Sequence, residues 1–294
     1  MFTEQNSVEN YIRDLICGSL PPARGGVAEG IAPYVPTGRN PKGVGWYFVP
    51  AQALPRRIND VFIEEYVRQS LIRLNPSIAA RPERADEVLY KLRAIVLSVR
   101  SDGLIRANEE FTAWLRGERS MPFGLNNEYV TIRLIDFDDL DQNQYVATTQ
   151  YTFRAGSAER RADLLLLVNG FPFVLVEAKT PVRQAVSWAD AALQVHDDYE
   201  KFVPELFTPN VFSVATEGKE LRYGAIHAPV EQWGPWRPDD ALSGGGLVDL
   251  QKSVQSLLRP NVLLDILANF TLFATDKKSG GHHSQNPSFR LCRQ

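Results

Sequence analysis

Two short segments of this sequence carry acidic and basic side chains at the ends of apolar runs. Asp163 begins a run that continues through five apolar residues, and Glu177 and Lys179 close a second apolar run. The runs are separated by Asn169-Gly170, which favours a tight hairpin turn because both positions tolerate a positive φ. Side chains alternate along a strand, so Glu177 and Lys179 share one face. The spacing predicts a hairpin that aims two carboxylates and one ammonium group at a common point.

These three side chains have the chemistry that hydrolysis of a phosphodiester requires. Two carboxylates can hold Mg²⁺ through oxygen ligands, and Mn²⁺ can substitute for it. A bound metal acidifies water and neutralises developing charge, and Lys179 beside it can orient or deprotonate that water. Alternatively, Glu177 and Lys179 only mark where a buried strand emerges into solvent, with Asp163 as an edge charge. The apolar surroundings favour a site, because ionised groups there are costly unless paired or metal-bound.

The hydrophobic pattern predicts helices in the first and last thirds of the chain and strands between them. Helices are expected at residues 8–16 with Ser7 as N-cap, 58–74, 83–99, a short stretch capped by Asn108, 184–202, and 247–273 with an interruption at Pro260. Strands are expected at residues 129–137, 144–153, 162–168, 173–178, 210–215 and 221–226.

This order of elements is typical of an α/β fold. We expect a mixed sheet of about five strands, flanked by helices, with an N-terminal helical portion packed beside it. We divide the chain into an N-terminal helical and loop portion (1–125), a core that carries the predicted site (126–240) and a C-terminal helical segment (241–294).

Length and composition are those of a globular protein with a substantial core. The chain has 294 residues, of which 44% are hydrophobic and 23% charged, and a formal net charge of −3. This charge argues against tight autonomous DNA binding, which needs clustered Lys and Arg, but it allows a small basic cleft. Cys17 and Cys292 lack metal-ligand spacing, so we expect a reducing cytoplasm. We find no signal peptide and no apolar run long enough to cross a membrane.

The segment RADLLLLVNGFPFVLVEAKTP, residues 161–181, resembles the core of the N-terminal domain of type I restriction enzyme R subunits. That family has a PD-(D/E)xK nuclease motif in the context Arg-Pro-Asp…Asn-Gly-x-Pro…Glu-x-Lys, and Ala162 here replaces the proline. The resemblance runs along nearly the whole chain. Further matching stretches follow in the expected order: SVENYIRDLI (7–16), LIRLNP (71–76), LIDFDD…QNQYVATTQYTF (134–153), VPELF (203–207) and LLDILANF (263–270).

The resemblance implies a restriction-endonuclease-like fold and a DNA endonuclease. Asp163 and Glu177 would be metal ligands, Lys179 the catalytic lysine, and Glu9 an auxiliary acidic residue near the metal. Double-stranded DNA would be the substrate, and methyltransferase and specificity subunits would supply sequence choice. ATP would serve only a motor beyond these residues, in which we find no phosphate-binding loop with its Lys-Ser/Thr.

The family often has Gln-x-x-x-Tyr on the helix after the nuclease motif. Here Gln194 and Tyr199 are five residues apart, and Val195 occupies the usual glutamine register. Residues four apart share one face of an α-helix, whereas residues five apart are rotated away from each other. The spacing therefore predicts that Gln194 does not act as in the family. Tyr199, Arg160 and Arg161 are expected to contact DNA, with a solvated strand end as the alternative for the two arginines.

Two other functions remain open from the sequence. The chain could be a non-cleaving module that docks a motor onto a methyltransferase core, or the nuclease domain of a different helicase-linked defence system. The final residues, 289–294, look like the opening of another element, and Arg293-Gln294 resembles the start of a motor's first nucleotide-contacting motif. We therefore expect a longer polypeptide, in which helicase motifs with a type I signature would support the main interpretation.

Overall fold

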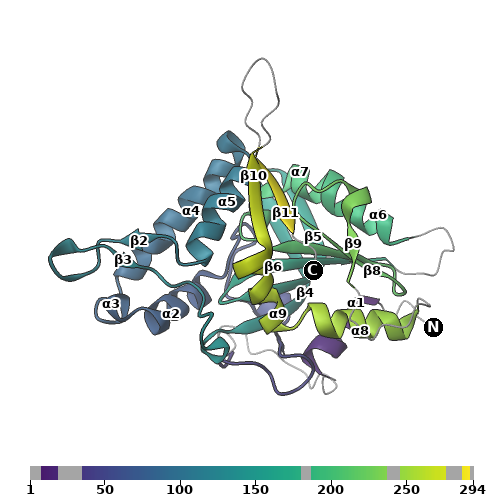
Figure 1. Cartoon of the computed structure of the whole chain (residues 1–294), viewed down its shortest axis with the longest axis horizontal. Coiled ribbons are helices and arrows are strands. Elements are labelled where there is room, and N and C mark those ends of the chain that lie inside the picture. Colours follow the sequence, from purple (N-terminus) through teal and green to yellow (C-terminus); the bar gives the residue numbers. More distant parts are fainter. Residues whose placement is uncertain (1–7, 19–34, 180–186, 237–245, 276–286, 292–294) are drawn as a thin grey trace, which may run out of the picture.

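A seven-stranded mixed sheet forms the centre of the fold (Figure 1). The computed structural model describes residues 8–18, 35–179, 187–236, 246–275 and 287–291, so the predicted cap Ser7 lies outside the described residues. The strand order is β1-β4-β5-β6-β7-β8-β9, with β1/β4 and β6/β7 parallel and the other pairs antiparallel. The strands are β1 (Tyr47–Phe48), β4 (Tyr145–Ala155), β5 (Ala158–Val168), β6 (Phe171–Ala178), β7 (Phe212–Thr216), β8 (Leu221–Gly224) and β9 (Gly234–Pro235). The predicted α/β class is confirmed.

The predicted Asn-Gly turn joins the two central strands, β5 and β6. Asn169 and Gly170 both have positive φ, 50° and 90°, as a two-residue hairpin turn requires. The side chain of Asn169 also accepts a hydrogen bond from the Gln144 amide at 2.8 Å. A Cβ on Gly170 would lie 2.7 Å from the carbonyl oxygen of Ile63, so the turn packs too closely for another residue. The hairpin is thereby fixed both by its turn and by its neighbours.

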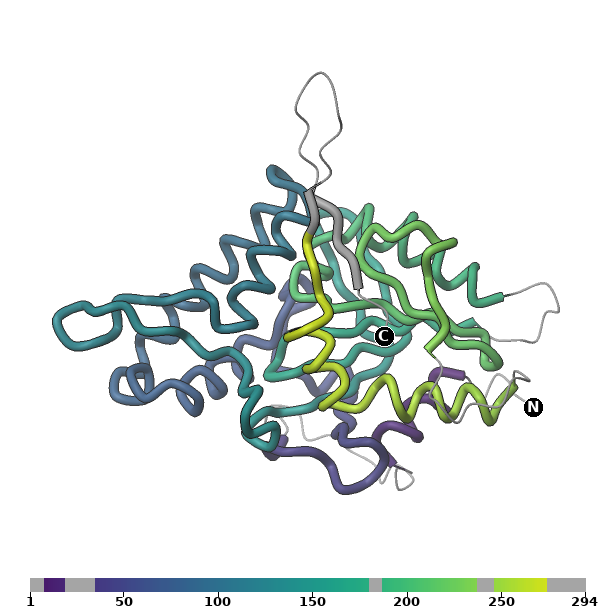
Figure 2. The backbone as a smooth tube through the Cα atoms, in the orientation of Figure 1, coloured from purple at the N-terminus to yellow at the C-terminus, as the bar shows by residue number. Residues whose placement is uncertain are grey.

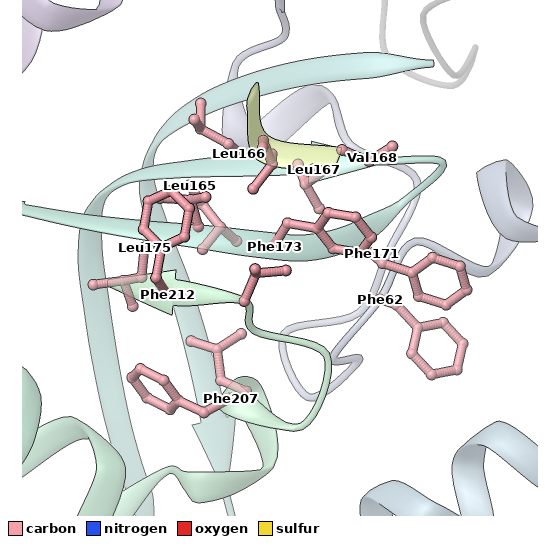
Figure 3. Close-up of a cluster of buried hydrophobic side chains, with 14 of the residues drawn as sticks. Phe62, Leu165, Leu166, Leu167, Val168, Phe171, Phe173, Leu175, Phe207 and Phe212 are labelled. Carbon is pink, nitrogen blue, oxygen red and sulfur yellow. The ribbon is translucent and has the colours of Figure 1, made fainter. Parts of the chain in front are cut away.

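The hairpin is buried because its side chains are apolar on both faces. Figure 3 shows leucines of β5 and β6 packed with phenylalanines from β6, from β7, from the 3₁₀-helical η5 (Pro204–Phe207) and from the loop that contains Phe62. Strands buried on both faces read as continuous apolar runs, which is why residues 164–168 and 173–176 lack alternation. The labelled side chains are Phe62, Leu165, Leu166, Leu167, Val168, Phe171, Phe173, Leu175, Phe207 and Phe212, all at most 3% exposed.

Helices pack around this sheet in three groups. One group lies at one end of the sheet (left in Figure 1), and a second follows the β5/β6 hairpin in the sequence. The third group brings α1 together with helices from residues 247–265. The first group is α2 (Glu64–Leu74), α3 (Pro76–Ala79), α4 (Arg84–Asp102) and α5 (Leu104–Leu115). The second is α6 (Trp188–Leu193), the π-helical η4 (Gln194–Tyr199) and α7 (Glu200–Phe202), and the third is α1 (Val8–Cys17) with α8 (Leu247–Leu257) and α9 (Pro260–Asp265).

Several predicted boundaries differ from the structure for identifiable reasons. The strand expected at residues 129–137 is reduced to β3 (Val130–Thr131), which pairs only with β2 (Ser120–Met121). Beyond β3, side chains satisfy the backbone: Asn75 bonds both the amide and the carbonyl of Arg133, and Asp136 accepts from two following amides. Side-chain hydrogen bonds of this kind compete with strand pairing.

The helix expected at residues 58–74 begins only at Glu64. The preceding residues form turns and bends that are held against the sheet, because Ile58 accepts a hydrogen bond from Arg154 of β4 and Ile63 donates one to Gly170. At the other end of the chain, the interruption predicted at Pro260 is confirmed as the break between α8 and α9. The helical stretch ends in the π-helical η7 (Ile266–Phe270), and β10 (Thr271–Thr275) follows, paired with β11 (Pro287–Leu291).

Asn108 was predicted as a helix cap, and this prediction is wrong. Asn108 lies inside α5 and is completely buried. Its side-chain amide donates to the carbonyl oxygens of Thr208 and Asn210, each at 2.9 Å, and to that of Phe207 at 3.4 Å. A polar residue therefore occupies a core position because it satisfies the backbone of the loop that enters β7.

We expect Asn108→Ala to lower the free energy of unfolding by about 3 kcal/mol, since it leaves buried carbonyl groups without their donor. Urea unfolding followed by circular dichroism measures this loss. Gln69→Ala, which removes an amide from the exposed face of α2, should change stability by less than about 0.5 kcal/mol. A loss of similar size in the two variants would contradict this role of Asn108.

Across the described residues, no helix combines the length and apolar character needed to cross a bilayer.

Candidate metal-dependent nuclease site

Asp163 and Glu177 face each other from the two central strands. The β5/β6 ladder pairs Leu164 with Val176, so the next residue on each strand brings these carboxyl groups side by side. Asp163 Oδ2 accepts a hydrogen bond from the amide of Ala178 at 2.9 Å, which ties it to β6. The juxtaposition predicted from the Asn-Gly hairpin is therefore present in the fold.

Glu177 is a buried carboxylate with one oxygen unsatisfied. The residue is 2% exposed, and its Oε2 has no hydrogen-bond partner within the described part of the chain. Its Oε1 lies 3.2 Å from Nζ of Lys179. Burial, together with the nearby Asp163 carboxylate, raises the pKa of Glu177 to about 7 in spite of Lys179. Such an oxygen is costly to leave unpartnered, and a carboxylate oxygen is the kind of ligand that a divalent cation takes.

Burial also raises the pKa of Asp163, although the Ala178 amide and Lys179 oppose this shift. The two facing carboxyl groups thus disfavour each other's ionisation, as expected for like charges in a partly desolvated place.

Glu9 reaches the same place from α1. Its pKa is raised to about 7 by burial and by the Asp163 carboxylate, which sets it beside Asp163. Glu9 Oε2 accepts a hydrogen bond from Nε2 of Gln150 at 2.6 Å. The structure therefore brings Glu9 to the predicted site, together with Gln150, which sequence reasoning did not single out. No sequence signal marks Gln150, since it is one polar residue within a strand.

Gln194 and Tyr199 do lie together, contrary to the expectation from their spacing. Residues 194–199 form the π-helical segment η4, in which positions five apart align. Gln194 Nε2 donates to the Tyr199 hydroxyl at 2.7 Å, and Gln194 Oε1 accepts from Nζ of Lys179. The extra residue is absorbed as a π-helical turn, so the expectation that Gln194 stands apart is wrong.

Tyr199 links this helix to β5. Its hydroxyl donates to the carbonyl oxygen of Arg161 at 2.8 Å. Burial, and then the nearby Glu177 carboxylate, raise the pKa of this hydroxyl. Lys179, Gln194, Tyr199 and β5 are thus joined by an unbroken series of hydrogen bonds. This series fixes the ammonium group beside Glu177.

The two arginines of β5 differ in their surroundings. Arg160 forms a two-point ion pair with Asp198, at 2.5 and 2.6 Å, and lies over the Phe202 ring at 5.0 Å. Arg161 is exposed, and its charge opposes the rise that burial causes in the pKa values of Glu9 and Asp163. Arg161 therefore lies beside the acidic groups, whereas Arg160 is held against the helix that carries Tyr199.

The residues present fit a hard divalent cation of the Mg²⁺ type. Within the described residues, no group of three or more His, Cys, Asp or Glu side chains converges tightly enough to hold a metal without other ligands. Mg²⁺ is commonly held by only one or two carboxylates and keeps several waters. Asp163 and Glu177 supply that number, with the unpartnered Glu177 Oε2 among their oxygens.

The raised pKa values predict that the metal-free protein loses stability as pH rises. In the folded chain the pKa values of Glu177 and Glu9 are about 7, whereas the ordinary pKa of a glutamate is 4.5. Between these values the folded chain holds protons that the unfolded chain has released, so stability falls from about pH 4.5 to pH 7 and then levels off. We expect a fall of several kcal/mol, since each of the two groups contributes about 1.4 kcal/mol per pH unit over this interval, and urea unfolding in EDTA measures it. The slope should largely disappear in Glu9→Gln/Glu177→Gln, and an unchanged slope there would contradict the assignment.

Comparison with known proteins places the chain in a family. The family described as "Type I restriction enzyme R protein N terminus" matches residues 39–232, a range that contains Gln150, Asp163, Glu177, Lys179 and Tyr199. The endonuclease subunit of the type I restriction enzyme HindI from Haemophilus influenzae is 27% identical over 265 residues, covering 82% of this chain and 24% of that protein. The putative type I restriction enzyme MjaVIIP endonuclease subunit of Methanocaldococcus jannaschii is 28% identical over 156 residues, covering 50% of this chain and 14% of that protein.

The chain spans about a quarter of the length of the first of these relatives. Its matched range includes the whole β5/β6 hairpin and the helix that follows it. On this match, the chain belongs to the family of type I restriction enzyme R protein N-terminal regions.

Proposed function

We propose that this chain is the nuclease domain of a type I restriction endonuclease subunit and hydrolyses phosphodiesters of double-stranded DNA at Asp163, Glu177 and Lys179. One observation carries the proposal: Glu177 is buried with an unpartnered oxygen, faces Asp163, and has the Lys179 amine 3.2 Å away. A perturbed carboxylate pair with a fixed cationic neighbour is typical of catalytic sites.

The chain's own residues have distinct tasks in this reaction. Asp163 and Glu177 would hold Mg²⁺, or Mn²⁺ in its place, and the bound ion would acidify a water molecule and neutralise charge on the phosphate. Lys179 is held on one side by Glu177 and on the other by Gln194. Its remaining proton can be directed at the attacking water or at a phosphate oxygen, where positive charge is most useful in the transition state.

Other residues support or extend the site. Glu9 adds acidic character beside Asp163, and Tyr199 anchors Gln194, which in turn positions Lys179. Arg161 is exposed next to the carboxylates and is suited to a phosphate contact. Arg160 is paired with Asp198 and supports the helix in this arrangement.

The wider setting follows from the relatives, whose names describe endonuclease subunits of type I restriction enzymes. We propose that cleavage follows ATP-driven translocation by a motor outside this chain, within a cytoplasmic complex with methyltransferase and specificity subunits. The division at residues 125 and 240 stays a prediction. In the fold, β1 of the first portion pairs with β4 of the second. Helix α8 of the third portion packs against α1 of the first and β8 of the second.

Incubation of supercoiled plasmid with the chain tests the proposal. We expect nicking with Mg²⁺ or Mn²⁺, none in EDTA, and none from Asp163→Asn/Glu177→Gln, which removes both charges with little change in volume. Glu64→Gln, which breaks a surface ion pair with Arg93, is the matched control and should cleave normally. Cleavage by the double variant would place the site elsewhere. If no protein cleaves, the same variants are tested in a full-length subunit assembled with its partners, and inactivity there would favour the docking module.

A further inference from the structure

Gln150 has a backbone conformation that its residue type and position do not explain. It lies in the middle of β4 with φ 55°, in the left-handed region that disfavours L side chains. The β4/β5 ladder pairs Thr149 with Leu164 and Tyr151 with Ala162, so the register is the same on both sides. No residue is inserted, as it would be in a β-bulge. The distortion is confined to Gln150, directly opposite Asp163.

The other described non-glycine residues with positive φ occupy turns and loops. Asn126 and Asn127 lie in η2 (Leu125–Asn127), Asn169 in the hairpin turn, and His227 in a loop. Asparagine tolerates this region, and none of these residues interrupts a strand. Gln150 thus differs from them in residue type and in secondary structure.

The conformation directs the Gln150 amide between two carboxyl groups. Nε2 of Gln150 donates to Glu9 Oε2 at 2.6 Å, and the same side chain is close enough to Asp163 to oppose the rise that burial causes in the pKa of that carboxyl group. A primary amide has two N–H donors, so one glutamine can serve both acids at once. Gln150 therefore ties α1 to β4 next to Asp163, beside two groups whose charges repel each other.

Both flanks of Gln150 are tied down, which allows the distortion to persist. Before it, Ala147 pairs with β1 and accepts a hydrogen bond from Val49. After it, the guanidinium of Arg56 bonds the Thr152 carbonyl and lies 3.6 Å from the Tyr151 ring centroid. Gln150 thus lies between the part of β4 that pairs with β1 and the part that is bonded by Arg56. Surroundings that fix both sides of a disfavoured residue are characteristic of functional sites.

We propose that Gln150 is a positioning residue that holds Glu9 against Asp163, so that Glu9 contributes to cation binding at the site. This inference rests on the proposed function, because it takes Asp163 as a cation ligand. Without the amide, like-charge repulsion and the freedom of the Glu9 side chain would move its carboxylate away from Asp163. The strained backbone is retained because an extended residue would carry its side chain elsewhere.

A double-mutant cycle tests whether Gln150 acts through Glu9. Mn²⁺ binding to the full chain is measured by isothermal titration calorimetry for wild type, Gln150→Gly, Glu9→Gln and the double variant. We expect each single variant to bind Mn²⁺ about 10-fold more weakly, as is usual when a residue supporting a metal ligand is lost. The double variant should be no weaker than Glu9→Gln alone, because Gln150 has nothing left to position. Losses that multiply, or unchanged binding in Gln150→Gly, would overturn the role.

Thermal melting in EDTA tests the contact without metal. Gln150→Gly relieves the positive φ but loses the hydrogen bond to Glu9, so the two effects oppose each other. Its melting temperature should lie within about 2 °C of wild type, so that weaker Mn²⁺ binding would not reflect misfolding. The shifts of the two single variants should not add, and additive shifts would overturn the contact. Asn127→Gly, which relieves a similar φ of 62° in η2, should leave Mn²⁺ binding unchanged.

Failure of the proposed function has a different signature. If wild type binds no Mn²⁺, or Asp163→Asn/Glu177→Gln binds it as tightly as wild type, the cation site itself is wrong and the role of Gln150 falls with it. If Asp163→Asn/Glu177→Gln loses Mn²⁺ binding while Gln150→Gly binds Mn²⁺ like wild type, only the role of Gln150 is wrong.

Discussion

Glu177→Gln is expected to remove metal-dependent DNA cleavage and to stabilise the metal-free protein. Cleavage should fall by at least about 10³-fold, because the charge that holds the cation and the several kcal/mol that the cation contributes are lost together. Stability should rise at pH 8, since the folded environment disfavours ionised Glu177 even beside Lys179. An increase of about 2–4 °C in melting temperature corresponds to roughly 1 kcal/mol.

Plasmid cleavage and melting in EDTA, on one preparation, measure both effects. Glu64→Gln is again the comparison, because it removes a carboxylate that is paired with Arg93 at the surface. It should change neither cleavage nor melting appreciably. Loss of cleavage together with loss of stability would mean that Glu177 is a structural residue and that the variant is damaged.

Lys179→Ala is expected to slow cleavage by about 10²- to 10³-fold while leaving cation binding intact. Lys179 bonds Glu177 and Gln194 but faces the cation site as a like charge. Its removal should therefore leave Mn²⁺ affinity unchanged or slightly higher, unlike removal of either carboxylate.

Single-turnover cleavage and Mn²⁺ calorimetry separate these two effects. Lys219→Ala removes an exposed lysine from the β7/β8 turn and serves as the matched control. Parallel loss of cleavage and of Mn²⁺ binding in Lys179→Ala would assign Lys179 to the shape of the metal site rather than to the chemical step.

The central hairpin could be predicted from the sequence because its signals are local. Asn169-Gly170 requires a turn, the apolar runs require burial, and alternation fixes the face of Glu177 and Lys179. These signals do not depend on distant parts of the chain. The α/β class and the positions of the carboxylates followed from them.

The remaining features depend on contacts between distant residues. Asn108 can occupy a buried helix position because its side-chain amide donates to carbonyl groups about a hundred residues later in the chain. The conformation of Gln150 depends on Glu9 and on Arg56, which lie in other segments. A count of residues placed Gln194 and Tyr199 on different faces, because it assumed an α-helical repeat that η4 does not follow.

The packing of α1 against α8 bears on the order in which the segments around the candidate site come together during synthesis. The hydroxyl of Tyr11 donates to Gln251 at 3.5 Å, and the indole of Trp46 donates to the Leu258 carbonyl at 2.6 Å (Figure 2 shows the purple and yellow-green segments side by side). Helix α1 carries Glu9, yet its partner helix leaves the ribosome about 240 residues later. Helix α1 also contacts β1, β4, β5 and β6, so a nascent chain can place it on the sheet before α8 is made. Helix α8 therefore adds its contacts to a helix that already carries Glu9 beside the β5/β6 hairpin, and it does so only near the end of translation of this region.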